Sequence, residues 1–340
     1  MKKKSSIFEK TFFYIIVGFF IFSTSHVLAS EKTYEFTVGH GSSSNIAMNP
    51  AWKIFKEKVE TRSNGKIKIE IFGAGAICNE GPCGEQLGQG SLDFASLSTG
   101  NWGAFTDTLY TIDMPYVFKT YEHAKRAITG SVGDILKKRS EEKDDVKLLA
   151  IISSYGYRNL YNNVKEVRVP DDLKGIKIRT VLSPIEQNLV KSWGATPLNV
   201  PWGELYQSLE TKIVNGFYVP DGWIYNYKLH EVAPYVTETG GLFNWQIMLM
   251  RLDRYEELTD ELKKVIDIAA KETELETWEI DYKWGQEIKG KMEKEGVKFY
   301  KPTPDELKQW ESVKEDMLKM FKNQIDQELL KEIDKYHTSK

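Results

Sequence analysis

The sequence predicts an α/β protein, and three observations lead to that prediction. Strand-like apolar segments alternate with amphipathic, helix-like segments along much of the chain. This alternation is typical of α/β architecture with mostly parallel strands. The chain has 340 residues, enough for two domains or one large one. No long linker, tandem repeat or low-complexity block separates the segments, so a chain with two domains would cross between them more than once.

The first half of the chain supplies strands around an amphipathic helix. Trp52, Phe55 and Val59 have the spacing of one helix face. Asn64-Gly65 is a turn signal before the next strand. The strands are predicted at residues 34–38, 66–72, 92–97 and 147–152.

The second half continues the alternation and then becomes helical. Residues 175–216 read as strand, helix, strand and helix, and Arg179 ends the first of these strands. Two charged helices are predicted at 256–294 and 305–336, with a break at 296–304. We expect them to brace both domains. A solvated helical face over a single core is the alternative.

The N-terminus has the pattern of a cleaved secretory signal peptide over residues 1–29. Four lysines precede an apolar run at 12–22, and Val27-Leu28-Ala29 forms a small-residue cleavage pattern. The run is shorter than the roughly 20 residues of a membrane span, and no cysteine at the cut offers a lipid anchor. We therefore expect a soluble periplasmic protein. The signal segment carries a net charge of +3, so cleavage changes the net charge from −3 to −6, which argues against a nucleic-acid partner.

Cys78 and Cys83 form a close pair in the segment ICNEGPCGEQ. In an oxidising compartment such a pair predicts a disulfide that closes a small loop. Free thiols and, more remotely, a redox-active pair are the alternatives. A metal site would need further ligands, and no histidine lies nearby in sequence, so neither a metal nor a cofactor is predicted.

Recognisable catalytic motifs are missing from the chain. The patterns GxSxG, HExxH and GxxxxGK[ST] are all absent. We predict no catalytic residue and no enzyme. A periplasmic hydrolase or lyase that uses His40 and Glu80 is the alternative, because His40 follows the first strand and is placed to face a cleft.

Binding chemistry centres on Arg179. A guanidinium stays charged at physiological pH, and its planar fork of donors matches a carboxylate. If the strand end opens into a cleft, Arg179 is an anion clamp; a surface salt bridge is the alternative. Aromatic residues follow, and Trp202 is favoured for the cleft because it comes after Val200-Pro201 at a strand end.

Several ordered motifs carry a family resemblance over essentially the whole mature chain. They are Gly90–Phe94, Met114–Phe118, Asp172–Arg179, Pro201, Glu204–Leu209 and Val214–Gly216. With this pattern the chain resembles the extracytoplasmic solute-binding proteins of tripartite ATP-independent periplasmic (TRAP) transporters, of the type that binds C4-dicarboxylates or sialic acid. The resemblance implies two α/β domains of a class II-like periplasmic binding protein, with the ligand cleft between them. It implies domains at 30–154 with 243–284 and at 155–242 with 285–335.

The resemblance also assigns roles to single residues. It implies that Arg179 forms a salt bridge to the ligand carboxylate, with Arg158 as a second arginine near the ligand. Trp202 falls on an aromatic position that packs on the ligand. Pocket positions that vary with the substrate are Ser98, Asn101 and Ser183.

The chain departs from the family pattern at positions that bear on the ligand. Val219 replaces an asparagine that often contacts the ligand. Val219 and its neighbour Tyr218 are counted among the ligand-binding candidates, as are His40 and Glu80. Ser98 and Asn101 stand where sialic-acid binders carry charged residues, and Glu80 sits in the cysteine loop near the expected cleft mouth. We therefore expect an aromatic, branched or keto monocarboxylate, with a dicarboxylate next.

The partners implied are a small organic acid and the small and large membrane subunits of a TRAP permease. A binding protein that serves a sensor kinase is the alternative.

Overall fold

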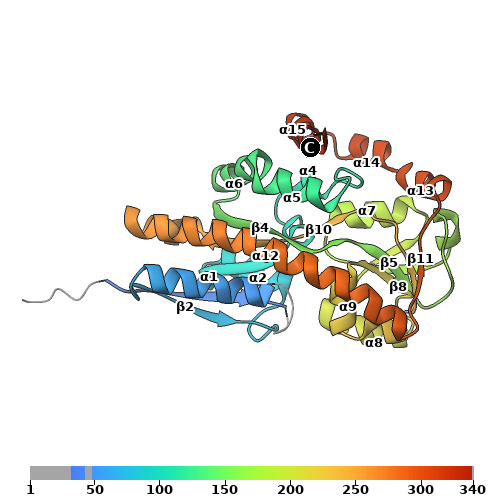
Figure 1. Ribbon diagram of the computed structural model, residues 1–340, viewed down its shortest axis with the longest axis horizontal. Coiled ribbons are helices and arrows are strands. Elements are labelled where there is room, and N and C mark those ends of the chain that lie inside the picture. The colour runs from blue at the N-terminus through green and yellow to red at the C-terminus, as the bar shows by residue number, and fades with distance from the viewer. Residues whose placement is uncertain (1–31, 43–47, 339–340) are drawn as a thin grey trace, which may run out of the picture. The chain divides into compact units, whose positions relative to one another are not determined.

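The computed structural model describes residues 32–42 and 48–338, which form two β-sheets flanked by helices (Figure 1). The predicted signal peptide lies outside the described residues. Within them, sheet A has five strands, in the order β2 (Ile67–Phe72), β1 (Tyr34–His40), β3 (Phe94–Ser98), β10 (Phe243–Arg251) and β4 (Val146–Tyr157). Sheet B has six, in the order β11 (Lys298–Tyr300), β9 (Tyr235–Thr237), β5 (Asn159–Asn162), β8 (Gly216–Val219), β6 (Lys177–Thr180) and β7 (Thr196–Asn199).

The chain passes between the two sheets more than once. Arg158 alone separates β4 of sheet A from β5 of sheet B, and the chain returns to sheet A between β9 and β10. The predicted α/β class is confirmed. The expectation of mostly parallel strands was wrong for β5 and β10, each of which runs antiparallel to both neighbours. Each follows the preceding strand, which belongs to the other sheet, with no helix in between. Neither is therefore reached by the helical crossover that usually makes neighbouring strands parallel.

Both faces of sheet A are buried. Along β10, Ile247 and Leu249 belong to one hydrophobic cluster, whereas Met248 and Met250 belong to another. This alternation follows from the two-residue period of a strand. Residues of α1 (Met48–Arg62) and of the first half of α12 (Asp260–Lys294) pack on the Met248 side. Helices α2 (Glu80–Gly88), α5 (Tyr121–Thr129) and α6 (Ser131–Lys143) contribute to the cluster on the opposite side.

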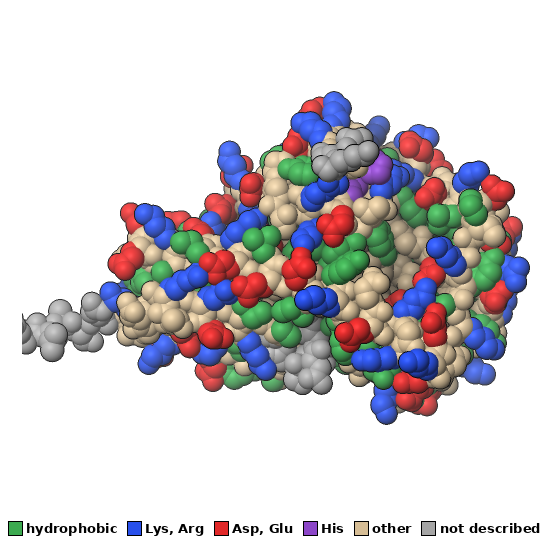
Figure 2. Space-filling view, viewed as in Figure 1, with side chains coloured by type: hydrophobic (Ala, Val, Ile, Leu, Met, Phe, Trp, Pro, Cys, Tyr) green, Lys and Arg blue, Asp and Glu red, His purple; other side chains and the backbone are tan. Residues whose placement is uncertain are grey.

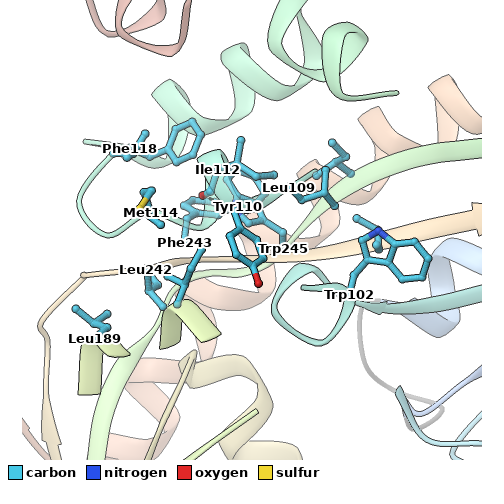
Figure 3. Close-up of a cluster of buried hydrophobic side chains, with 14 of the residues drawn as sticks. Trp102, Leu109, Tyr110, Ile112, Met114, Phe118, Leu189, Leu242, Phe243 and Trp245 are labelled. Carbon is cyan, nitrogen blue, oxygen red and sulfur yellow. Dashed lines mark hydrogen bonds between the residues drawn. The ribbon is translucent and has the colours of Figure 1, made fainter. Parts of the chain in front are cut away.

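Aromatic side chains at the start of β10 belong to a hydrophobic cluster that includes residues of elements next to both sheets (Figure 3). Trp245 donates its indole N–H to the carbonyl of Ile112 at 3.1 Å, and its ring lies 4.3 Å from that of Phe243. Leu189 reaches the same cluster from α7 (Pro184–Ser192), a helix that packs on β6 and β7. The cluster therefore ties β10 of sheet A to a helix that flanks sheet B.

The long helix α12 confirms the expected brace. It begins after Thr259, whose side chain caps the helix, and runs for 35 residues. Near its start Glu272 pairs with Arg62 of α1. Farther along, α12 packs on β4 and then on α9 (Asp221–Asn226), next to sheet B (Figure 1).

The second charged helix is three shorter helices, so its expected continuity was wrong. They are α13 (Pro304–Glu311), α14 (Lys314–Met320) and α15 (Gln327–Thr338). Asp326 explains the last break, because its side chain accepts hydrogen bonds from the backbone N–H groups of Glu328 and Leu329 and so starts a new helix. Helix α15 packs on α5 and α6, where the hydroxyl of Tyr336 accepts from the backbone N–H of Ser131.

The surface is charged and mixed. On the face shown in Figure 2, lysines and arginines are interspersed with aspartates and glutamates. Across the described ranges, no helix combines the length and the apolar character that crossing a bilayer requires.

Candidate functional site

A cavity of about 160 Å³ lies between side chains that come from both sheets. Sheet B supplies Arg179 at the end of β6 and Val219 at the end of β8. From sheet A come Ser98 at the end of β3 and Gln246 in β10. The remaining lining residues are Gly41, Asn79, Glu80, Gly81, Pro82, Asn101, Arg158, Val181, Leu182, Asn199, Val200, Pro201, Trp202, Trp223 and Asn244.

Arg179 is a buried cation that lines this cavity, with 4% of its surface exposed. Its Nε donates to the carbonyl of Val200 at 2.9 Å, and its guanidinium lies 5.5 Å from the ring of Trp202. Burial lowers the pKa of Arg179 to about 10, partly opposed by the nearby Glu186, so the group remains charged at neutral pH. Among the described residues no carboxylate forms an ion pair with Arg179. Its two Nη groups are therefore left for other acceptors.

Arg158 lines the same cavity but already has a protein partner. Its Nη1 lies 2.6 Å from Glu186 Oε2, and both side chains are buried. Glu186 sits in the first turn of α7, whose start is capped by the side chain of Ser183. The cap and the ion pair together fix the N-terminal turn of α7 beside the cavity.

Aromatic and aliphatic side chains form one wall of the cavity. The rings of Trp202 and Trp223 meet edge to face, with their centroids 5.3 Å apart. Trp223 is fixed in turn by a hydrogen bond from its indole N–H to Ser154 Oγ at 2.8 Å. Val219 completes the wall from β8.

Glu80 stands on the sheet A side of the cavity, in a network of donors. Its Oε2 accepts from the backbone N–H and the hydroxyl of Ser98 and from the side-chain amide of Asn101. Its Oε1 accepts from the amide of Gln246 at 2.9 Å. Ser98 and Asn101 therefore hold Glu80 in place as well as lining the cavity.

The cysteine loop that carries Glu80 is closed by a disulfide between Cys78 and Cys83. The predicted pairing is confirmed, and the alternative of free thiols was wrong. Both cysteines are buried against β1, where a Cβ on Gly39 would lie only 2.7 Å from Cys78 Sγ. The disulfide thus anchors the first turn of α2, where Glu80 begins the helix.

Three residues predicted from the sequence lie outside the cavity lining. His40 is buried at the end of β1, and burial lowers its pKa to about 4, so it is neutral at neutral pH. Tyr218 is fully buried, and its hydroxyl accepts from the backbone N–H of Leu242 at 3.1 Å. Ser183 serves as the cap of α7.

The sequence prediction missed Glu186 and Gln246 as residues of this region, and among the aromatic residues after Arg179 it favoured Trp202 without singling out Trp223, which also lines the cavity. The Ser-Pro-Ile-Glu start of α7 is a helix-capping signal, but it does not reveal that Glu186 faces Arg158. Gln246 lies 166 positions from Glu80, with no local pattern that connects them. Within the described ranges, no group of three or more His, Cys, Asp or Glu side chains is placed to hold a metal ion.

The chain is similar to bacterial solute-binding proteins. Residues 38–324 match the model of the family described as bacterial extracellular solute-binding protein, family 7. The chain is 27% identical to the 2,3-diketo-L-gulonate-binding periplasmic protein YiaO of Escherichia coli, over 77% of this chain and 78% of that protein. It is also 27% identical to the C4-dicarboxylate-binding protein DctB of Bacillus subtilis, over 88% of this chain and 85% of the relative.

Solved structures show the same fold. A TRAP periplasmic solute-binding protein from Ochrobactrum anthropi, with its C-terminus bound in the ligand-binding pocket, superposes with a TM-score of 0.79. It is 26% identical and matches over 90% of this chain and 95% of its own. One from Haemophilus influenzae with bound L-gulonate has a TM-score of 0.84 at 21% identity, covering 89% of this chain and 100% of that one.

Proposed function

The chain belongs to family 7 of the bacterial extracellular solute-binding proteins, and from this premise we propose that it captures a small organic acid for a TRAP transporter. The names of its relatives support an acid, since both 2,3-diketo-L-gulonate and C4-dicarboxylates carry a carboxylate. We infer that the protein acts as a carrier and not as an enzyme. The cavity between the two sheets is where the ligand would bind.

The observation that carries this proposal is the state of Arg179. It is a buried cation on the cavity wall, without a protein carboxylate to pair with among the described residues. Leaving a charge buried and unpaired is unfavourable, and an incoming carboxylate removes that cost. The Arg179 fork accommodates a carboxylate in bidentate fashion. Trp202 and Val219 then pack on the carbon skeleton of the ligand.

The size and lining of the cavity limit which acids would fit. Its volume of about 160 Å³ is small beside the roughly 300–1,000 Å³ of common ligand pockets. Val181, Leu182, Val219 and two tryptophans give it an apolar wall. These features support a compact acid with an apolar body, in line with the monocarboxylate predicted from the sequence.

We propose the domain division predicted from the sequence, 30–154 with 243–284 and 155–242 with 285–335. The presence of two sheets supports it, whereas the boundary at 284/285 divides α12. The boundary at 154/155 falls within the final residues of β4, and that at 242/243 falls at the start of β10. The packing of α15 on α5 and α6 favours grouping residues 327–338 with the first domain. We propose that the domains close over the ligand by a hinge motion at these crossings.

We propose the periplasm as the location of the protein and the small and large permease subunits as its partners. The first part rests on the family, which is extracellular, and on the signal-peptide pattern. The second part rests on the likeness to TRAP solute-binding proteins.

The test is calorimetry of Arg179→Ala with the tightest acid found by thermal-shift screening of the purified protein. Truncating one partner of a buried charge pair costs roughly 2–5 kcal/mol, so the affinity should fall by about 30-fold or more. Arg168→Ala is the matched control, since the Arg168 side chain is 59% exposed and pairs with Glu166 on the surface. If Arg179→Ala binds the acid as tightly as the wild type does, the carboxylate clamp is wrong.

A further inference from the structure

Glu80 brings a carboxylate into a cavity that is expected to receive another carboxylate. It is half-buried and lies on the side opposite β6, held by four hydrogen bonds from Ser98, Asn101 and Gln246. In each of these hydrogen bonds the partner donates and a Glu80 oxygen accepts. Oε2 takes three of them, whereas Oε1 takes one, and an ionised carboxylate oxygen accepts about two. Glu80 Oε1 therefore has room for one more donor.

Glu80 forms no ion pair with a cation in the described part of the chain, although lysines and arginines pair with carboxylates elsewhere on the molecule. A neutral glutamine would serve the four donors less well, because only one of its two polar atoms accepts hydrogen bonds. The four donors therefore fit a carboxylate at position 80 better than a neutral amide, and this carboxylate lines the cavity where the ligand would bind.

The charges around the cavity show what kind of ligand would balance them. Arg158 is offset by Glu186, and Arg179 is close enough to Glu80 for that carboxylate to affect its titration. These four groups sum to zero. A monocarboxylate would leave the enclosed set at −1 and a dicarboxylate at −2. A ligand that carries one cation as well as one carboxylate keeps the balance, and buried unbalanced charge is costly.

The distribution of polar groups indicates a ligand with two polar ends. Arg179 enters from sheet B and Glu80 from the sheet A side, and the Trp202 wall lies in the same cavity. Val181 and Leu182 offer no hydrogen-bonding side chain, whereas Asn199 and Asn244 are uncharged polar groups in the same lining. A short body with a carboxylate at one end and a charged nitrogen at the other fits both ends.

We propose that the cavity selects a zwitterionic amino acid or a closely similar compound, with its carboxylate on Arg179 and its cationic nitrogen on Glu80. The proposal rests on the proposed function, since Arg179 must hold the carboxylate. The new element is that Glu80 determines specificity, because its carboxylate attracts a cationic nitrogen of the ligand and repels a second carboxylate.

The experiment compares acids that share a skeleton and differ in one group. Alanine, leucine and phenylalanine are titrated calorimetrically into the purified protein, each beside its hydroxy and keto analogues. β-Alanine and γ-aminobutyrate are compared with propanoate and butyrate, and succinate represents the dicarboxylates. We expect the amine to bind at least about tenfold more tightly than its analogues in the tightest set. A hydroxy, keto or dicarboxylic acid that binds most tightly overturns the proposal, as does failure of every amine to bind.

Variants of Glu80 show whether this residue makes the distinction. In Glu80→Gln the ratio between amine and keto acid should fall to about one, while the keto acid keeps its affinity within about threefold. Glu80→Ala serves if the glutamine variant folds poorly, because each ratio is measured within one variant. A ratio that persists in both variants overturns the role of Glu80.

Arg179→Ala in the same series separates the two proposals. It should weaken every acid alike. If it weakens none while Glu80→Gln abolishes the preference for amines, the carboxylate clamp fails and the role of Glu80 stands.

Discussion

Two arginines line one cavity and differ in what they touch. Arg158, between β4 and β5, is held 2.6 Å from Glu186. Arg179, at the end of β6, donates to a backbone carbonyl and lies near Trp202, with no carboxylate paired to it in the described part of the chain. From the sequence, both were expected near the ligand, with Arg179 as the carboxylate clamp and Arg158 as a second arginine. The charge of Arg158 is thus paired within the protein, whereas Arg179 forms no such pair, which is why we propose Arg179 as the carboxylate site.

The two arginines differ in what their buried charge costs the fold. A buried charge that the protein pairs internally stabilises the fold only as long as both partners remain. A buried charge without an internal partner costs stability, and a ligand of opposite charge can offset that cost. In this respect Glu80 resembles Arg179, because hydrogen bonds hold it and no cation of the described residues pairs with it.

The largest expected effect is on stability, from Arg158→Met. It leaves Glu186 buried without its cation, which costs about 3–5 kcal/mol. Chemical unfolding should show this loss in the free energy of unfolding. The double variant Arg158→Met/Glu186→Leu should recover most of it, since it removes both charges. If single and double variants are equally destabilised, the pair does not act as described.

Removing the disulfide should have the next largest effect. For a loop with a sequence separation of 5, the chain-entropy relation gives a loss of about 2 kcal/mol for Cys78→Ala/Cys83→Ala. Because the loop positions Glu80, ligand discrimination should weaken along with stability. Chemical unfolding and the amine-to-keto affinity ratio measure the two effects. An unchanged ratio would mean that the hydrogen-bond network alone positions Glu80.

A smaller effect on stability is expected from Arg179→Met. The unliganded variant should unfold within about 1 kcal/mol of the wild type, because the change removes a buried cation that forms no ion pair with a carboxylate of the described residues. Differential scanning calorimetry of ligand-free protein provides the measurement. A loss as large as that of Arg158→Met would erase the distinction between the two arginines.

A separate effect, on the pH dependence of stability, concerns Asp113, which lies near the Arg158–Glu186 pair. Burial raises the pKa of Asp113 from 3.8 to about 7, although Thr99 donates a hydrogen bond to its carboxylate. Between these pH values the unfolded chain releases this proton and the native protein retains it. Stability from this group is therefore present at low pH and is lost as pH rises toward about 7.

Asp113→Asn removes that dependence. Its free energy of unfolding should gain on that of the wild type between about pH 4 and about pH 7 and then run parallel to it. Asp281, whose pKa burial also raises to about 7, contributes equally to both curves. A constant difference between variant and wild type across this range would contradict the assignment.

Local patterns in the sequence predicted the elements well and their long-range pairing poorly. The helix around Trp52 and the strand ending at Arg179 follow from apolar periodicity, which is a local property. The direction of β10 depends on where the chain re-enters sheet A, which periodicity does not encode. The break before α15 was readable only through the capping role of Asp326.

The same limit applies to the site. Arg179, Trp202 and Glu80 were predicted and lie together on the cavity wall. Glu186 was missed because its meaning depends on Arg158, which lies 28 positions away on another element. His40 was placed near a cleft from its position at a strand end, but its side chain is buried. A strand end marks a residue as close to a site without giving the direction of its side chain.

Whether Arg179 binds the ligand carboxylate is tested most directly by a thermodynamic cycle on these two groups. Calorimetry measures the binding of the tightest acid and of its carboxamide, which lacks the negative charge, to wild type and to Arg179→Ala. If Arg179 holds the carboxylate, the wild type should prefer the acid by about 30-fold or more, and this preference should vanish in the variant. If the variant keeps the full preference for the acid, another group binds the carboxylate and the assignment of Arg179 is wrong.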